Sequence, residues 1–244
     1  THTCAILDDA ALKCWGYGRN GELGTGSTSD SHSPVSVSFD AGRTVVAIAA
    51  GGGHTCAILD NLTVQCWGEN SDGQVGDGTT TERTTPAYVS LGGSLASVSE
   101  RDIDGDGTLN ILDTHMRTSS IATGGDHTCA ILDDASLKCW GKNDYGQLGD
   151  GSSTHSTTPV EVSLPSGRTA DSISAGLQHT CAVLDDGSLY CWGDNGYGSL
   201  GDGTTTSSST PVQVSLPSGR TAASASAGEF HTCTVLDDAS LYCW

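Results

Sequence analysis

Residues 179–203 read HTCAVLDDGSLYCWGDNGYGSLGDG, and this stretch decides the fold because close copies of it recur along the chain. Its two cysteines are ten positions apart, and every copy repeats that spacing. Successive copies begin 52, 73, 52 and 52 positions apart, so the chain is a tandem array with one insertion of about 21 residues. The pairs are Cys4–Cys14, Cys56–Cys66, Cys129–Cys139, Cys181–Cys191 and Cys233–Cys243, which leaves no cysteine over.

The cysteine spacing favours disulfides over metal sites. Zinc ligands usually come as close C-x-x-C pairs, and the sequence contains none. Two cysteines on opposing strands of a short hairpin are better placed to form a disulfide. Disulfides persist in oxidising compartments, so we expect an extracellular or cell-surface protein.

Each copy contains four short segments of small or β-branched residues separated by turn residues, as in residues 211–244. Four short strands per unit are typical of a β-propeller blade. If Cys4 faces Cys14 across a hairpin, then Ile6 faces Leu12, and the acidic residues between them form the turn. The sequence therefore predicts an all-β fold of tandem four-stranded blades.

A glycine-rich segment, W-G-x-N-x-x-G-x-L-G-D-G, follows the hairpin, as at residues 140–151 and 192–203. Together with A-G-x-x-H-T-C, D-x-S-L-x-C-W and P-V-x-V, it resembles the repeat of the regulator of chromosome condensation family over nearly the whole chain. The resemblance implies a β-propeller, usually of seven blades, with glycines in turns and Leu and Trp between blades. The cysteine pairs depart from the nuclear, guanine-exchanging members and resemble the secreted, disulfide-stapled branch instead.

We expect residues 1–244 to form one repeat array. The predicted units are a half blade at 1–15 and blades at about 34–67, 86–140, 159–192 and 211–244. Four and a half units are too few for a seven-bladed ring. The array is then an open spiral, is completed by another chain, or is a piece of a longer polypeptide.

The insertion, at residues 100–117, contains the pattern D-x-D-G-D-G-x-x-N-x-x-D. Oxygen ligands at loop positions 1, 3, 5, 7, 9 and 12, with glycine at position 6, suit calcium. The predicted ligands are Asp102, Asp104, Asp106, Thr108, Asn110 and Asp113. The closing Asp resembles the loop of dockerin-type repeats, but dockerins carry two loops, so cohesin binding is not implied. The alternative is an acidic loop without metal.

The amino-acid composition makes several classes of function and partner unfavourable. A net charge of −19 disfavours nucleic acid as a partner, because phosphate backbones require clustered cations. The sequence has no apolar run long enough to span a membrane. The histidine that recurs once per unit suits either a metal ring or a structural hydrogen bond, and we favour the hydrogen bond. Asn61, in the sequence Asn61-Leu62-Thr63, is a candidate glycosylation site at a hairpin tip.

These features favour a non-enzymatic extracellular structural or adhesive protein, stapled by disulfides and stabilised by calcium. Its expected partners are further copies of itself, as in a surface filament, or another surface protein or a glycan. The alternative is a secreted protein-binding module or inhibitor. A guanine nucleotide exchange propeller is a remote alternative, because the sequence lacks clustered basic residues and carries the cysteine pairs.

Overall fold

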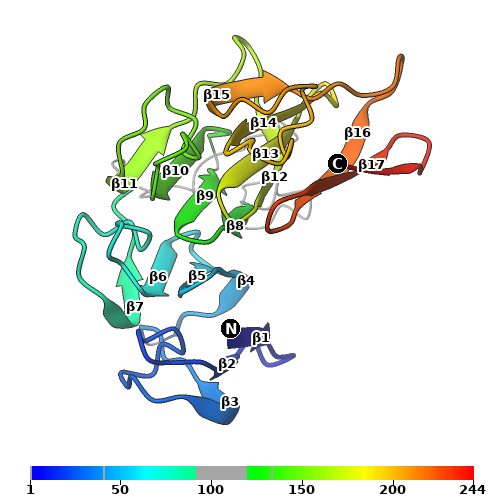
Figure 1. The fold of residues 1–244 in the computed structure, drawn as a ribbon. Coiled ribbons are helices and arrows are strands. Elements are labelled where there is room, and N and C mark those ends of the chain that lie inside the picture. The colour runs from blue at the N-terminus through cyan, green and yellow to red at the C-terminus, as the bar shows by residue number, and fades with distance from the viewer. Residues whose placement is uncertain (1, 41, 92–119, 133) are drawn as a thin grey trace.

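The computed structural model describes residues 2–40, 42–91, 120–132 and 134–244. In these ranges the regular elements are β-strands, grouped into five antiparallel sheets that follow one another along an arc (Figure 1). The first sheet contains β1 (His2–Ile6), β2 (Leu12–Gly16) and β3 (Ser31–Ser36). The second contains β4 (Val45–Ala50), β5 (His54–Leu59), β6 (Val64–Gly68) and β7 (Arg83–Tyr88).

The remaining sheets repeat this order. The third contains β8 (Ile121–Thr123), β9 (His127–Ile131), β10 (Leu137–Gly141) and β11 (Ser156–Glu161). The fourth contains β12 (Ala170–Ala175), β13 (His179–Leu184), β14 (Leu189–Gly193) and β15 (Ser208–Gln213). The fifth contains β16 (Ala222–Ala227), β17 (Thr232–Leu236) and β18 (Leu241–Cys243).

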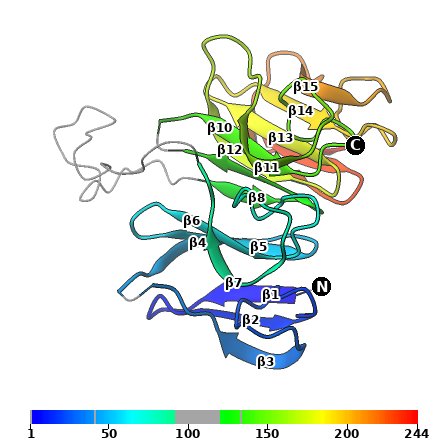
Figure 2. The ribbon, with the colours of Figure 1, turned by 90° about the vertical axis from the view of Figure 1, so that its left-hand side faces the viewer.

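Every sheet is a meander, because strands adjacent in sequence are adjacent in the sheet. The first strands of the later sheets, β4, β8, β12 and β16, pack against one another along the concave side of the arc (Figure 1). Viewed at 90°, successive sheets are stacked face to face (Figure 2). This is the arrangement of propeller blades, and it confirms the predicted all-β repeat fold.

The predicted hairpin register is also confirmed. Cys4 pairs with Cys14 and Ile6 with Leu12 across β1 and β2. The hairpins of the other four sheets have the same cysteine-to-cysteine register. The acidic residues lie in the tight turn that joins the two strands, as turn preference requires.

The predicted blade boundaries are wrong by one strand. The strand that carries Pro34 pairs with the hairpin before it, Cys14 opposite Val35, rather than opening the next blade. The predicted half blade 1–15 therefore belongs to a sheet that extends to Ser36. The blades predicted at 34–67, 86–140, 159–192 and 211–244 each join the outer strand of one sheet to strands of the next.

The proline itself explains the true boundary. Pro34, Pro86, Pro159 and Pro211 lie in β3, β7, β11 and β15, the last strand of each sheet in which they occur. Proline has no N–H to donate to a ladder, so it suits an edge strand. A repeating sequence fixes the length of the period but not the point at which one sheet ends, and hydrogen bonding decides that point.

The apolar core lies between the sheets. One cluster joins Leu137 and Leu148 of the third blade to Leu184 and Trp192 of the fourth, and all four side chains are almost completely buried. Equivalent clusters lie at the other junctions. Each blade thus depends on its neighbour to bury its apolar face, as in other repeat proteins. Among the described residues, no helix has the length and apolarity needed to cross a membrane.

Candidate interaction face

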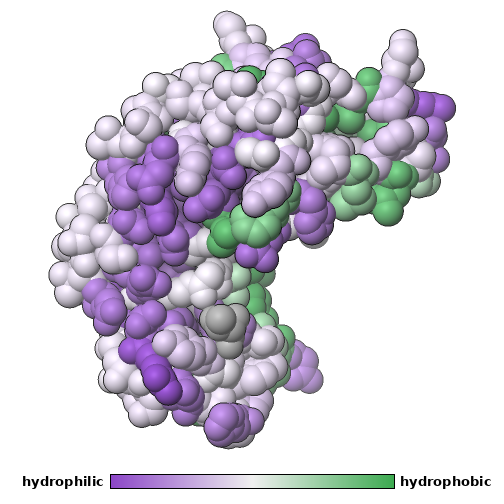
Figure 3. All heavy atoms as spheres, in the orientation of Figure 1, coloured by the Kyte–Doolittle hydropathy of each residue, from purple (hydrophilic) through white to green (hydrophobic). Residues whose placement is uncertain are grey.

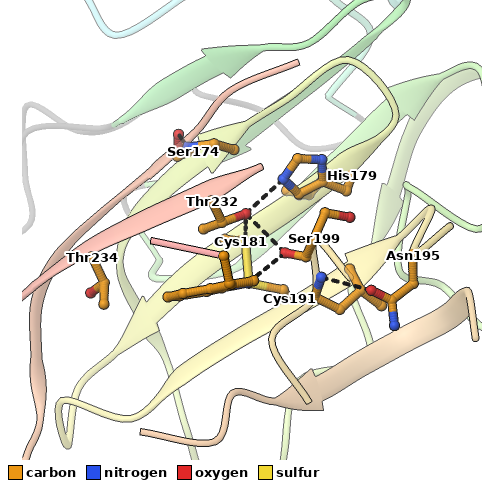
Figure 4. The surroundings of a disulfide bond; sticks show 12 residues. Ser174, His179, Cys181, Cys191, Asn195, Ser199, Thr232 and Thr234 are labelled. Atoms are coloured by element: carbon orange, nitrogen blue, oxygen red, sulfur yellow. Dashed lines mark hydrogen bonds between the residues drawn. A yellow bond between two sulfur atoms is a disulfide. The ribbon is translucent and has the colours of Figure 1, made fainter. Parts of the chain in front are cut away.

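All five cysteine pairs are disulfides, each within its own hairpin, and none of the cysteines is free. By the chain-entropy model, closing a loop of this length stabilises the fold by roughly 3 kcal/mol per bond. The disulfide is important for the array because the hairpin that it closes also carries the polar side chains that join one blade to the next. In Figure 4 the Cys181–Cys191 bond lies among these groups.

A shared carbonyl joins adjacent blades. His179 Nε2 lies 2.8 Å from the hydroxyl of Thr232 in the next blade, and that hydroxyl donates to the carbonyl of Ser199, 2.9 Å away (Figure 4). Trp244 Nε1 donates to the same carbonyl at 2.9 Å. We call this set a blade junction. The equivalent sets are His2, Thr55, Glu22 and Trp67; His54, Thr128, Gln74 and Trp140; and His127, Thr180, Gln147 and Trp192.

The blade junction fixes the state of the histidine. The threonine hydroxyl has one proton, which it gives to the carbonyl, so it must accept from His Nε2–H. Nδ1 then carries no proton, and in His2, His54 and His127 it is buried without a partner among the described residues. Burial lowers the pKa of His54 and His127 to about 3, and neighbouring histidines contribute to this lowering. The histidines of the blade junctions therefore make structural hydrogen bonds as neutral rings.

Repeat glycines make room for these groups. A Cβ on Gly124 would lie 2.2 Å from Cε1 of His127, and one on Gly149 would lie 2.7 Å from Nε1 of Trp192. Gly149 also has a φ of 70°, a conformation that other residues avoid. The A-G-x-x-H and L-G-D-G motifs are thus requirements of close packing at the blade junction.

A buried asparagine organises the long loop after Trp-Gly in the second, third and fourth blades. Asn195 Oδ1 accepts from the Leu200 amide at 2.9 Å, and Nδ2 donates to the carbonyls of Thr204 and Thr206. Asn70 and Asn143 make the same bonds in their own loops. These loops are therefore held in one shape, and they present their remaining side chains from a fixed backbone.

Three repeat positions carry different residues from blade to blade. The residue after Trp-Gly is Tyr17, Glu69, Lys142 or Asp194. The residue before the recurring histidine is Gly53, Asp126, Gln178 or Phe230. The residue before the first positive-φ glycine of the long loop is Asn20, Asp72, Tyr145 or Tyr197. All three positions lie at the end of the blade where the second strand of each hairpin leaves the sheet, and we call this surface the loop face.

These variable side chains meet both within a blade and across a blade boundary. Lys142 Nζ lies 3.5 Å from Asp126 Oδ2 of the same blade, and the rings of Tyr197 and Phe230 lie 5.2 Å apart between the fourth and fifth blades. Tyr197 is 74% exposed. In the space-filling view, hydrophilic residues gather over the middle of the array (Figure 3). The loop face is therefore continuous from one blade to the next.

His155 links two blades through carboxylates. Its Nδ1 lies 3.1 Å from Asp72 of the second blade, and its Nε2 lies 2.9 Å from Asp144 of the third. Each ring nitrogen thus faces a carboxylate oxygen, which can accept a hydrogen bond from it. The bridge adds an electrostatic contact to the blade junction beneath it.

The middle of the loop face is strongly acidic. Burial, followed by the charge of Asp126, raises the pKa of Glu69 above its ordinary value. Partial burial opposes the charge on Lys142, but Asp126 and Asp72 outweigh it and raise the pKa of that lysine. Glu22 is buried at the first junction, and burial raises its pKa as well. Among the described residues, Lys142 therefore lies among several carboxylates, Asp72, Asp126 and Asp144.

The other predicted site residues lie elsewhere. The predicted calcium ligands Asp102, Asp104, Asp106, Thr108, Asn110 and Asp113 fall outside the described residues. Within the described ranges, no cluster of His, Cys, Asp and Glu is suited to a metal ion. Asn61 lies at a hairpin tip, at the end of the blade opposite the loop face. The variable loop face was missed by sequence reasoning, although aligning the copies with one another would have marked its three positions.

The family model for the RCC1-like domain matches residues 1–244. The chain belongs to the RCC1-like domain family. It is 30% identical over 243 residues to the ultraviolet-B receptor UVR8 of Arabidopsis thaliana, covering 99% of this chain and 50% of that protein. It is 30% identical over 233 residues to the human E3 ubiquitin-protein ligase HERC2, covering 95% of this chain and 4% of HERC2. The RCC1-like chain thus spans half or less of these relatives.

Solved structures show the same fold. Human WBSCR16 superposes with a TM-score of 0.76 at 22% identity, covering 96% of this chain and 55% of that one. Yeast RCC1 (Prp20), solved with Kap60 bound to it, superposes with a TM-score of 0.76 at 22% identity, covering 99% and 53%. The RCC1-like propeller fold is therefore established, and the resemblance read from the repeat motifs is confirmed.

Proposed function

We propose that this RCC1-like chain is a non-enzymatic protein of the extracellular space or cell surface, with a structural or adhesive role carried by its loop face. The observation that carries the proposal is a division between repeat positions. The side chains that recur, such as His127, Thr180 and Trp192, are used to hold blades together. The side chains that differ, such as Glu69 and Lys142, meet on one surface.

A constant framework with a variable surface is what a binding scaffold needs, because contacts can change without disturbing the fold. The side chains that could act in catalysis also support a binding role. The histidines of the blade junctions, such as His54 and His127, are buried, neutral and already bonded to threonine. They are therefore poorly placed to act on a substrate.

The five disulfides support a place outside the cytosol, because cytosolic thiols are kept reduced. The acidic loop face favours partners with a positive surface, since complementary charge speeds encounter and rejects like-charged surfaces. Another surface protein, a glycan or a further copy of the chain is the expected partner. Yeast RCC1 binds the protein Kap60, so a propeller of this fold can act by binding.

Adhesion can be measured with protein-coated beads on cells of the source organism at moderate salt. Glu69→Gln combined with Asp126→Asn removes two charges from the loop face. Asp8→Asn combined with Glu161→Gln removes two charges elsewhere and serves as the matched control. We expect adhesion to fall several-fold for the first pair alone.

Equal adhesion of both double variants would contradict a role for the loop face.

A secreted binding module or inhibitor is the second candidate, and self-association separates it from a structural role. Sedimentation over a concentration series should show assembly for a structural protein and a constant mass for an inhibitor. The guanine nucleotide exchange alternative has support only from likeness in fold to yeast RCC1 at 22% identity.

Calcium binding by residues 102–113 is part of the same proposal, and it rests on the ligand pattern of the sequence. Extracellular sites of this type bind calcium with dissociation constants of about 10⁻⁴–10⁻³ M, and this weak affinity suits a stabilising role. Calorimetric titration of the whole chain should show one binding event that Asp104→Ala removes. A titration without heat in the unsubstituted chain would rule the site out.

A further inference from the structure

The hairpin tip of the second blade differs in sequence from the other four. Its turn carries Asn61 where the other tips carry an aspartate, and Thr63 follows two residues later. The aspartates at the equivalent position are Asp9, Asp134, Asp186 and Asp238. Asn61 thereby completes an N-x-T acceptor sequence, which none of the other four tips contains.

The asparagine performs the structural task of the aspartate with one atom. Asn61 Oδ1 accepts from the Thr63 hydroxyl at 2.7 Å and from the Thr63 amide at 3.2 Å. In the fourth blade, Asp186 Oδ1 accepts from the hydroxyl and amide of Ser188 in the same way. The turn therefore needs only Oδ1, and the second terminal atom of residue 61 is left for another use.

In the fourth and fifth blades an arginine lies beside that second atom. Arg168 Nη2 lies 2.7 Å from Asp186 Oδ2, and Arg220 Nη2 lies 2.9 Å from Asp238 Oδ2. An amide nitrogen cannot accept from a guanidinium, and Arg43 Nη1 of the second blade lies 3.7 Å from Asp60 Oδ1 instead. Asn61 Nδ2 makes no hydrogen bond within the described part of the chain and is not among its buried unsatisfied atoms.

We propose that Asn61 is an acceptor for an N-linked glycan. In the transfer, Nδ2 bonds to the anomeric carbon of a lipid-diphosphate-linked oligosaccharide. The bond from that carbon to the diphosphate oxygen breaks, and the lipid diphosphate leaves with the electron pair. Nδ2 loses one proton, which passes through solvent to the departing diphosphate. The turn geometry supports this, because Oδ1 and the Thr63 hydroxyl are held together while Nδ2 is free.

The position also separates the glycan from the proposed binding surface. Asn61 follows the end of β5, and the loop face lies at the opposite end of that strand, beside His54. A glycan at the tip would therefore cover the other rim and leave the loop face open. The inference does not depend on the adhesive function, since glycan occupancy is measured separately from adhesion.

The test is secretion of the whole chain from a eukaryotic host, followed by intact mass and peptide mapping with and without enzymatic removal of N-glycans. The unsubstituted chain should carry one glycan, at Asn61. Asn61→Gln and Thr63→Val should each abolish it, and Thr63→Ser should retain it in part. Asp186→Asn in the Asn61→Gln background places an acceptor sequence in the fourth tip and should restore one glycan.

This last variant is the matched control, because its turn has the same hydrogen bonds on the same framework. A glycan on the Asp186→Asn chain, with none on the unsubstituted chain, would overturn the assignment of Asn61. Absence of a glycan from both chains would also overturn the assignment of Asn61. It would show that the glycan-transferring enzyme cannot act on the disulfide-linked hairpin tips. Secretion of unmodified, correctly folded protein distinguishes that outcome from failure to fold.

Discussion

Acid should loosen the blade junctions, and His127 provides a sharp test. Its pKa falls from 6.5 to about 3 because burial disfavours the imidazolium. A lowered pKa means that the stability due to the neutral ring is complete above pH 6.5 and is lost as the pH falls toward 3. At about pH 4.5 the unfolded chain binds this proton and the folded chain does not, which costs about 2.7 kcal/mol for one histidine.

The physical reason lies in the hydrogen bonds of the junction. His127 Nε2–H is already given to Thr180, so the added proton must go to Nδ1, which is buried without a partner among the described residues. His54 has the same arrangement and nearly the same pKa, so its contribution should be similar. The carboxyl groups whose pKa is raised act in the opposite sense, but they are present in every variant and cancel in a comparison.

The assay is urea unfolding at about pH 7.5 and about pH 4.5. His127→Gln can still donate to Thr180 but does not titrate, and the exposed His32→Gln is the control. Between the two pH values, the unsubstituted chain and the control should each lose about 2.7 kcal/mol more than His127→Gln. Equal losses in all three chains would refute the assignment of a buried neutral histidine at the junction.

Two further substitutions test the loop and the glycine contacts. Asn143→Ala leaves the buried Leu148 amide without its acceptor, so it should cost about 2–4 kcal/mol in urea unfolding and should speed proteolysis of that loop. Gly149→Ala and Gly167→Ala both place a side chain at positive φ, but only at Gly149 would the new Cβ meet Trp192. Gly167→Ala should therefore cost about 1 kcal/mol, and Gly149→Ala should cost more by at least the same amount again; equal losses would show that the indole contact is unimportant.

Sequence reasoning succeeded where the information was local. The hairpin register around Cys4 and Cys14 followed from constant spacing and turn chemistry, both of which depend on neighbours in the chain. The blade boundaries failed because the choice of partner for the strand at Pro34 is made by hydrogen bonding across the loop. Periodicity alone contains no information about where a repeating sheet begins.

The hydrogen bonds of the blade junction could not be predicted from the sequence, for a related reason. His54 and Thr128 are 74 positions apart, and no single copy of the repeat contains both members of the pair. The sequence indicated a structural histidine, but not that its partner lies in the following blade. The contact between Tyr197 and Phe230 on the loop face was hidden for the same reason, because the two residues belong to different blades.

Whether this propeller works outside the cytosol is tested most directly by mapping the cysteines of protein isolated from its natural source without reduction. Alkylation before digestion should find no free thiol, and every linked peptide should join partners within one hairpin, as Cys129 joins Cys139. Such a result is expected of a protein that matured in an oxidising compartment. Alkylated cysteines in most hairpins of the natural protein would contradict the extracellular placement and, with it, the proposed adhesive role.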